Sequence, residues 1–214
     1  MSFFVKLFQI VNILSSKYNI DESHGIIHSM QILHYAHDIY ENEKMNFPIL
    51  QSEQQKNIIY TAAILHDMCD KKYVDENVGI LEIQNKWNSL FLEEKDYENT
   101  LEIATKIMST MSYSKVKKIG FPTDLGDYEI AYHIVREADL LCAYDFDRSM
   151  IYHIRKDNCN ILDAYHNAHS IFTDRILRHN IDNLFITEYG KKKSLQLHIQ
   201  SIQQLMTWKK LLRV

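Results

Sequence analysis

The chain has 214 residues, of which 46% are hydrophobic and 24% are charged, and its formal net charge is −4. A chain of this length can bury about 70% of the surface that it exposes when unfolded, so one full hydrophobic core is available. The apolar content excludes a disordered chain, and the mild acidity argues against an obligate nucleic-acid binder. With only 5 glycines and 2 prolines, the composition favours long helices, because sheets need turns that consume both residues.

The first 20 residues form an apolar segment with a helical pattern. Its apolar positions 3, 4, 7, 8, 10, 11 and 14 share one wide face, which predicts an amphipathic helix that packs on the core. Lys6 interrupts the apolar run, and neither a charged leading region nor a small-residue cleavage site is present, so a signal peptide is not expected. Without a run of about 18 uncharged apolar residues, we expect no membrane span.

Helical patterns continue along the rest of the chain. Asp21 has the residue type of a helix N-cap, and the almost wholly apolar run 58–65 is typical of a buried helix. Segment 112–127 contains one proline and two of the five glycines, which predicts a loop. We expect helices over 21–44, 52–69, 76–92, 94–111 and 128–144, and two or three more over 147–214 with Gly190 as a break.

These patterns predict a single all-α domain over residues 1–214. No alternating strand pattern, internal repeat or linker interrupts the sequence. The candidate metal-ligating and catalytic residues lie within about 20–150, and the helices of 151–214 are expected to pack on that part. Three cysteines without a CxxC pair do not make a disulfide framework, which indicates a reducing compartment and a cytoplasmic location.

Three places combine metal-ligating side chains with an apolar setting. His24 and His28 are four residues apart and share one helix face, and His66–Asp67 follows the buried run TAAIL. Asp139 is a carboxylate within an otherwise apolar helix, which is costly to bury unless it is paired or binds a metal. Two histidines and two aspartates would form a mixed nitrogen and oxygen site suited to a divalent transition metal.

At these residues the sequence resembles the HD-domain superfamily of metal-dependent phosphohydrolases, and in particular small bacterial members that act on nucleotides. The segments that carry the resemblance are SHGIIHSMQILHYA (23–36), AAILHDMCDKKY (62–73), MSYSK (111–115) and IVREADLLCAYDFDR (134–148), in the order of the family. The His-Asp dipeptide at 66–67 would alone be weak evidence for this resemblance, because His37–Asp38 is a second such dipeptide without a preceding apolar run.

The resemblance implies an all-helical bundle with one divalent metal ion, which could be Mn, Mg, Fe, Co, Ni or Zn. Its ligands would be His28, His66, Asp67 and Asp139. His28 matches the family pattern better than His24. His24 would lie one turn earlier and face the substrate or the residues that contact the metal ligands.

The implied activity is hydrolysis of a small phosphorylated molecule, in particular a nucleotide, by metal-activated water. Asp67 or the neighbouring Asp70 would orient that water or accept its proton. Lys72 is the first candidate to meet the phosphate charge, followed by Lys115 and Arg148.

Three positions depart from the family pattern. Met111 replaces a histidine, and a thioether cannot donate a proton. Glu137 replaces the first Asp of DAD, and Leu140 replaces an arginine, so one phosphate-binding cation would be missing.

These departures leave alternatives open. The chain could be an impaired HD protein that binds metal and nucleotide as a sensor or scaffold. A two-iron oxygenase is a more remote alternative, which would need extra ligands such as His24. A homodimer is compatible with the sequence, and no membrane or obligate nucleic-acid partner is expected.

Overall fold

The computed structural model describes residues 1–91, 97 and 99–214, and in this part of the chain it is an all-α bundle without strands. None of the described helices combines the length and apolarity needed to cross a membrane. The α-helices are α1 (Phe3–Tyr18), α2 (Ile26–Glu43), α3 (Glu53–Leu65), α4 (Glu76–Phe91), α5 (Thr100–Thr110), α6 (Tyr113–Ile119), α7 (Glu129–Cys142), α8 (Phe146–Lys156), α9 (Ile161–Asp174) and α10 (Glu188–Leu212).

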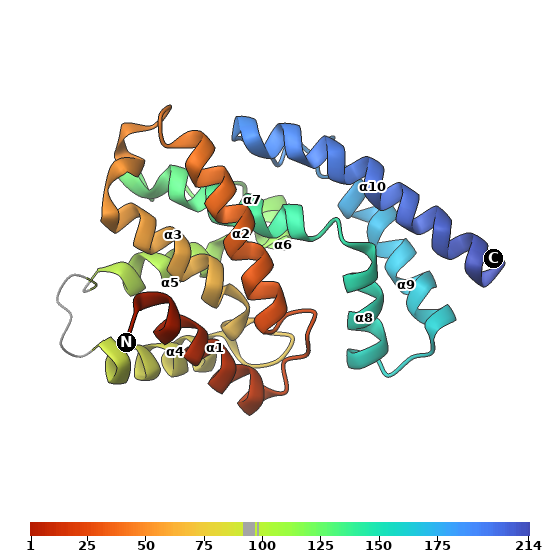
Figure 1. Ribbon diagram of the computed structural model, residues 1–214, viewed down its shortest axis with the longest axis horizontal. Helices are drawn as coiled ribbons and strands as arrows, with labels where there is room; N and C mark the ends of the chain where they lie inside the picture. Colours follow the sequence, from red (N-terminus) through yellow and green to blue (C-terminus); the bar gives the residue numbers. More distant parts are fainter. Residues whose placement is uncertain (92–96, 98) are drawn as a thin grey trace.

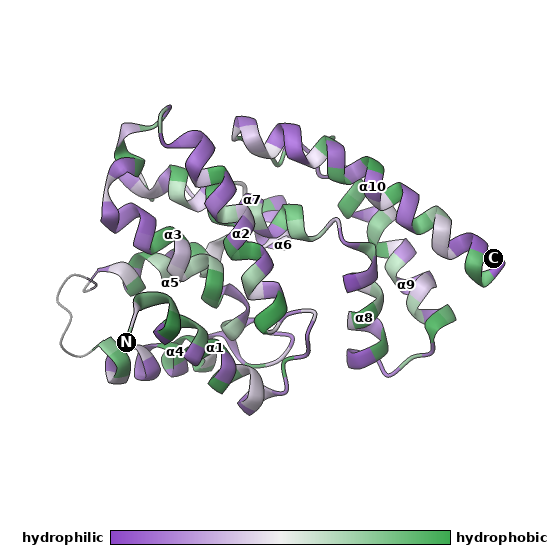
Figure 2. Cartoon of the chain, viewed as in Figure 1, coloured by the Kyte–Doolittle hydropathy of each residue, from purple (hydrophilic) through white to green (hydrophobic). Residues whose placement is uncertain are grey.

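The helices form two neighbouring groups that α10 joins (Figure 1). In the first group α2 packs against α3 and α7, while α3 also packs against α5 and α1. In the second group α8 and α9 form a helical hairpin. The long helix α10 contacts α2 and α7 as well as α8 and α9, so it spans both groups. Most of these helices carry both hydrophobic and hydrophilic residues (Figure 2).

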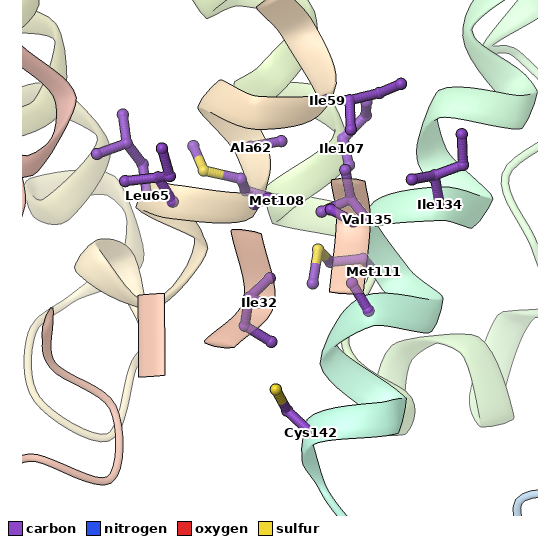
Figure 3. Packing of buried hydrophobic residues seen from close by; sticks show 14 of the residues in the cluster. Ile32, Ile59, Ala62, Leu65, Ile107, Met108, Met111, Ile134, Val135 and Cys142 are labelled. Atoms are coloured by element: carbon purple, nitrogen blue, oxygen red, sulfur yellow. The ribbon is translucent and has the colours of Figure 1, made fainter. Parts of the chain in front are cut away.

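Helix α3 lies at the centre of the first group because its second half is apolar on every side. The residues of 58–65 are all buried, as the run of apolar residues predicts. Figure 3 shows Ile59, Ala62 and Leu65 of this helix among side chains of its neighbours, including Ile107 and Val135. Burying one such aliphatic side chain contributes about 1.5–3 kcal/mol. This packing fixes the end of α3, where the 3₁₀ turn η2 (His66–Cys69) begins.

The prediction that Asp21 caps the second helix is wrong, because α2 begins at Ile26 after Gly25. The Asp21 carboxylate instead accepts hydrogen bonds from the Ser23 backbone N–H at 2.9 Å and from its hydroxyl at 2.5 Å. It also accepts one from the Tyr73 hydroxyl at 2.8 Å. Asp21 therefore ties the turn before α2 to the segment after η2.

The prediction of a loop over 112–127 is wrong for its first half, which forms α6. Ser112 caps this helix by accepting the Lys115 backbone N–H, and Gly120 ends it with a positive φ of 79°. The proline and both glycines fall at or after this end, so the composition described only the second half. The helix expected over 94–111 begins in residues outside the described part of the chain, where α5 starts at Thr100.

Gly190 does not break a helix, because it lies in the first turn of α10, which Thr187 caps. A Cβ at Gly190 would overlap Oε2 of Glu137. The Glu137 side chain is fully buried and accepts hydrogen bonds from the Ile186 and Thr187 backbone N–H groups and from the Thr187 hydroxyl. A glycine is therefore required by the close approach of this carboxylate.

Replacing Gly190 by alanine should lower the free energy of unfolding by about 2 kcal/mol, because the added methyl group must displace a buried, hydrogen-bonded carboxylate. Urea unfolding followed by circular dichroism measures this change. Lys192→Ala, at an exposed position of the same helix, is the control and should alter stability by less than about 0.5 kcal/mol. A Gly190→Ala protein as stable as the wild type would contradict this account.

Candidate metal centre

Three elements bring the predicted ligands together. His28 lies in the first turn of α2, His66 and Asp67 lie in η2, and Asp139 lies in α7. The packing of α2 against both α3 and α7 places these segments side by side. His66 is oriented by its own helix, because its Nδ1 lies 2.9 Å from the Ala63 carbonyl oxygen, to which it donates. Its Nε2 is thereby left for a ligand.

The distances define a compact group of donor atoms. Oδ2 of Asp67 lies 3.3 Å from Nε2 of His28 and 3.3 Å from Nε2 of His66. The donor atoms of these three residues all lie within 4.8 Å of one another. Oδ1 of Asp139 is farther away, at 3.7 Å from His28 and 4.0 Å from His66. The structure thus brings three predicted ligands into one group and places the fourth beside it.

The chemistry of this group fits a divalent metal ion. His28, His66 and Asp67 are only 1%, 8% and 6% exposed. Nε2 of His66 and Oδ2 of Asp67 are buried without a hydrogen-bond partner. A buried polar atom left unpaired costs about 1–3 kcal/mol, and a metal ion between these atoms would remove that cost. Two imidazoles and a carboxylate suit several divalent metals, so the donor set does not select one.

Burial and mutual charge set the protonation of the group. Burial alone would raise the pKa of Asp67, but the His66 and His24 imidazoles bring it well below its usual range. Burial and the Arg148 guanidinium hold the pKa of His28 well below its usual value. For His66, burial opposes protonation, but Asp67 outweighs it and raises the pKa to about 9. Without a metal, His66 therefore carries a proton at neutral pH that an ion must displace.

The group opens into a cavity of about 380 Å³. Its wall includes every residue that the sequence suggested for catalysis or substrate binding, namely His24, Asp67, Asp70, Lys72, Lys115 and Arg148. One side of the cavity belongs to α2, η2, α6 and α7, and the other to α8 and α9. A volume of this size accommodates a small organic molecule.

His24 stands beside the ligands in a chain of hydrogen bonds. Its Nε2 accepts a hydrogen bond from Lys72 Nζ at 3.0 Å. Its Nδ1 then donates to Ser23 Oγ at 2.7 Å or to the Tyr73 hydroxyl at 3.1 Å, and both of these groups donate to Asp21. Burial, together with the charge of Lys72 and Arg148, lowers the pKa of His24 to about 4. A neutral His24 therefore holds the lysine ammonium in place.

The two predicted lysines differ in how firmly they are held. Lys72 lies 3.4 Å from the Asp70 carboxylate as well as near His24, and it is exposed. Lys115 Nζ donates to the Glu76 carboxylate at 2.8 Å and to the Ser109 carbonyl oxygen at 2.6 Å. Lys72 is therefore the more available of the two for a ligand.

Arg148 reaches from α8 across the cavity to α2. Its Nη1 donates to the Ser23 carbonyl oxygen at 2.9 Å and lies 2.8 Å from Nδ1 of His28. The guanidinium group is therefore next to an imidazole of the candidate metal group, where it places a positive charge beside that group.

The positions that depart from the family pattern fall in different places. Met111 is buried in the wall of the cavity. Leu140 is also buried, but it lies outside the residues that line the cavity. Glu137 is bound to Thr187 and likewise lies outside that lining. Met111 is therefore the departure that faces a ligand.

Sequence patterns did not predict two residues of the cavity wall, Tyr152 and Arg175, which come from α8 and the end of α9. Their spacing from the ligands in the chain has no pattern, because they are brought in by the packing of the second helix group. Tyr113 of the MSYSK segment also lines the wall. Comparisons of the chain with protein-family models, with curated proteins and with solved structures find no match. Its function is therefore inferred from the site itself.

Replacing His66 by alanine should weaken Mn²⁺ binding by about 100-fold or more, because the ion loses a nitrogen donor. Isothermal titration calorimetry on the metal-free protein measures the affinity, and one ion per chain is expected for the wild type. His37→Ala removes the histidine of the second HD dipeptide, which is exposed, and should leave the affinity unchanged. Equal loss in both variants would contradict the assignment of the site.

The affinity for the ion should also rise with pH. Because His66 has a pKa of about 9, one proton must leave when an ion binds below that pH. Between pH 6 and pH 8 the dissociation constant should fall by up to about tenfold per pH unit. The number of protons released follows from the dependence of the binding enthalpy on buffer ionisation. A pH-independent affinity over this interval would contradict the protonation described here.

Proposed function

We propose that the chain is a metal-dependent phosphohydrolase that acts on a small phosphorylated molecule, in particular a nucleotide. The observation that carries the proposal is the buried pair of Nε2 of His66 and Oδ2 of Asp67, which lie 3.3 Å apart without a hydrogen bond, in a cavity whose wall also includes Lys72 and Arg148. Metal-ligating atoms beside cations are the arrangement that a phosphate ester needs.

In this proposal one part of the cavity holds the metal ion and the water, and the other part binds the phosphate charge of the substrate. The chemistry that a divalent ion supplies at His28, His66 and Asp67 is polarisation of a phosphoryl oxygen and acidification of a water molecule. Asp67 stays ionised, so its carboxylate can accept a hydrogen bond from the attacking water and orient it. Asp70 is paired with Lys72, which makes Asp67 the stronger candidate for this role.

The cations then hold the substrate. Arg148, beside His28, is placed to donate to oxygens of the phosphate at the ligand group. Lys72, held by the neutral His24, adds a second positive charge. The cavity volume of about 380 Å³ and the aromatic rings of Tyr113 and Tyr152 in its wall support a nucleotide as the class of substrate.

The test is hydrolysis by the purified protein with Mn²⁺ or Mg²⁺. We expect release of phosphate or pyrophosphate from at least one member of a nucleotide panel, and loss of that release in Asp67→Ala. Asp38→Ala, in the second HD dipeptide, is the matched control and should keep full activity. A wild-type protein that hydrolyses no member of the panel and no generic phosphoester would overturn the proposal.

One observation favours a second candidate, a sensor or scaffold that binds metal and nucleotide without turnover. Met111 lies in the cavity wall at the position where the HD proteins that the sequence resembles often carry a histidine. A thioether cannot transfer a proton. Calorimetry that shows nucleotide binding by the metal-loaded wild type, together with no product over a long incubation, would favour this candidate over the hydrolase.

A further inference from the structure

Arg175 is a cavity residue with no role in the function proposed above. It directly follows α9, and its side chain is partly buried in the cavity wall. The guanidinium carbon lies 4.4 Å from the centre of the Tyr113 ring, which comes from α6 on the opposite side of the cavity. Stacking on this ring fixes the plane of the guanidinium group.

The Arg175 side chain has a buried donor without an acceptor. Its Nε makes no hydrogen bond. An unpaired donor of a charged group in the interior costs free energy that a bound anion would recover. The side chain therefore has the properties of a receptor for an anion.

Three other cations of the cavity wall differ in this respect. Lys115 is paired with Glu76, and Lys72 lies near Asp70 and His24. Arg148 donates to the Ser23 carbonyl oxygen and lies against His28. Arg175 instead stacks on the Tyr113 ring, and the charge of Asp139 acts on its guanidinium group. Its buried Nε is therefore a cavity donor left for an anion.

We propose that Arg175 binds a second phosphate of the substrate, so that the site prefers molecules with two or more linked phosphates over monophosphates. This inference rests on the proposed function. A monophosphate at the ligand group would be met by Arg148 and would leave Arg175 unpaired. A diphosphate or triphosphate would extend along the cavity and supply oxygens to the guanidinium group of Arg175. The paired N–H donors of a guanidinium group bind phosphate in a bidentate manner.

The direct test measures anion binding by the metal-free protein with isothermal titration calorimetry. Inorganic pyrophosphate and orthophosphate are the two probes. Arg175→Met removes the charge and keeps an unbranched apolar side chain against Tyr113. Arg175→Lys keeps the charge but lacks the paired N–H donors of the guanidinium group. Arg178→Met is the control, because Arg178 lies one turn farther on and pairs with Asp182 at the surface. Thermal unfolding of each variant shows that it is folded.

We expect the wild type to bind pyrophosphate at least about tenfold more tightly than orthophosphate, and Arg175→Met to lose that preference. Arg175→Lys should retain part of it, and Arg178→Met all of it. The inference is overturned if folded Arg175→Met keeps the wild-type preference, if Arg178→Met loses as much as Arg175→Met, or if the wild type has no preference.

Hydrolysis distinguishes this inference from the function on which it rests. With Mn²⁺ present, Arg175→Met should raise KM about tenfold or more for a nucleoside diphosphate or triphosphate and leave monophosphate hydrolysis unchanged. Turnover by the wild type without any effect of Arg175→Met on KM or on pyrophosphate binding overturns the inference alone. Lack of turnover together with an Arg175-dependent preference for pyrophosphate overturns the hydrolase and keeps the anion site.

Discussion

The carboxylate of Asp67 lies in the protein interior, 3.3 Å from imidazole nitrogens of both His28 and His66. Such a charge is costly away from water unless a cation meets it. The second half of the helix before it, α3, is buried on every side and must be surrounded by other helices, which fixes where the His66–Asp67 pair lies. The position of the site is therefore a consequence of how the core packs, and its chemistry follows from the charge that the core encloses.

Much of this arrangement was predictable from the sequence, because local patterns carry it. The apolar run before His66 predicts the buried helix, and the isolated Asp139 in an apolar segment predicts a carboxylate near the ligands. Two of the errors have a common cause in contacts between distant segments. Asp21 accepts the Tyr73 hydroxyl rather than capping its own helix, and Gly190 is required by the carboxylate of Glu137, 53 positions earlier in the chain.

The far wall of the cavity could not be predicted for the same reason. Tyr152 and Arg175 belong to α8 and to the end of α9, and nothing in their spacing relates them to the ligands. They reach the site because these two helices pack as a hairpin opposite α6. The cavity thus combines a metal-ligating side that the sequence reveals with a side that the tertiary structure alone supplies. On that second side, the Nε of Arg175 is buried without a hydrogen-bond partner, which is the basis for proposing that it binds a second phosphate.

His28, His66 and Asp67 form a buried group that could hold a divalent metal ion. A crystal structure of the protein soaked in Mn²⁺, with anomalous differences measured, tests this assignment most directly. We expect an anomalous peak between Nε2 of His66 and Oδ2 of Asp67, at roughly 2.0–2.3 Å from each, with Nε2 of His28 as a further ligand. Anomalous density confined to surface histidines such as His166, with none at the buried group, would contradict it.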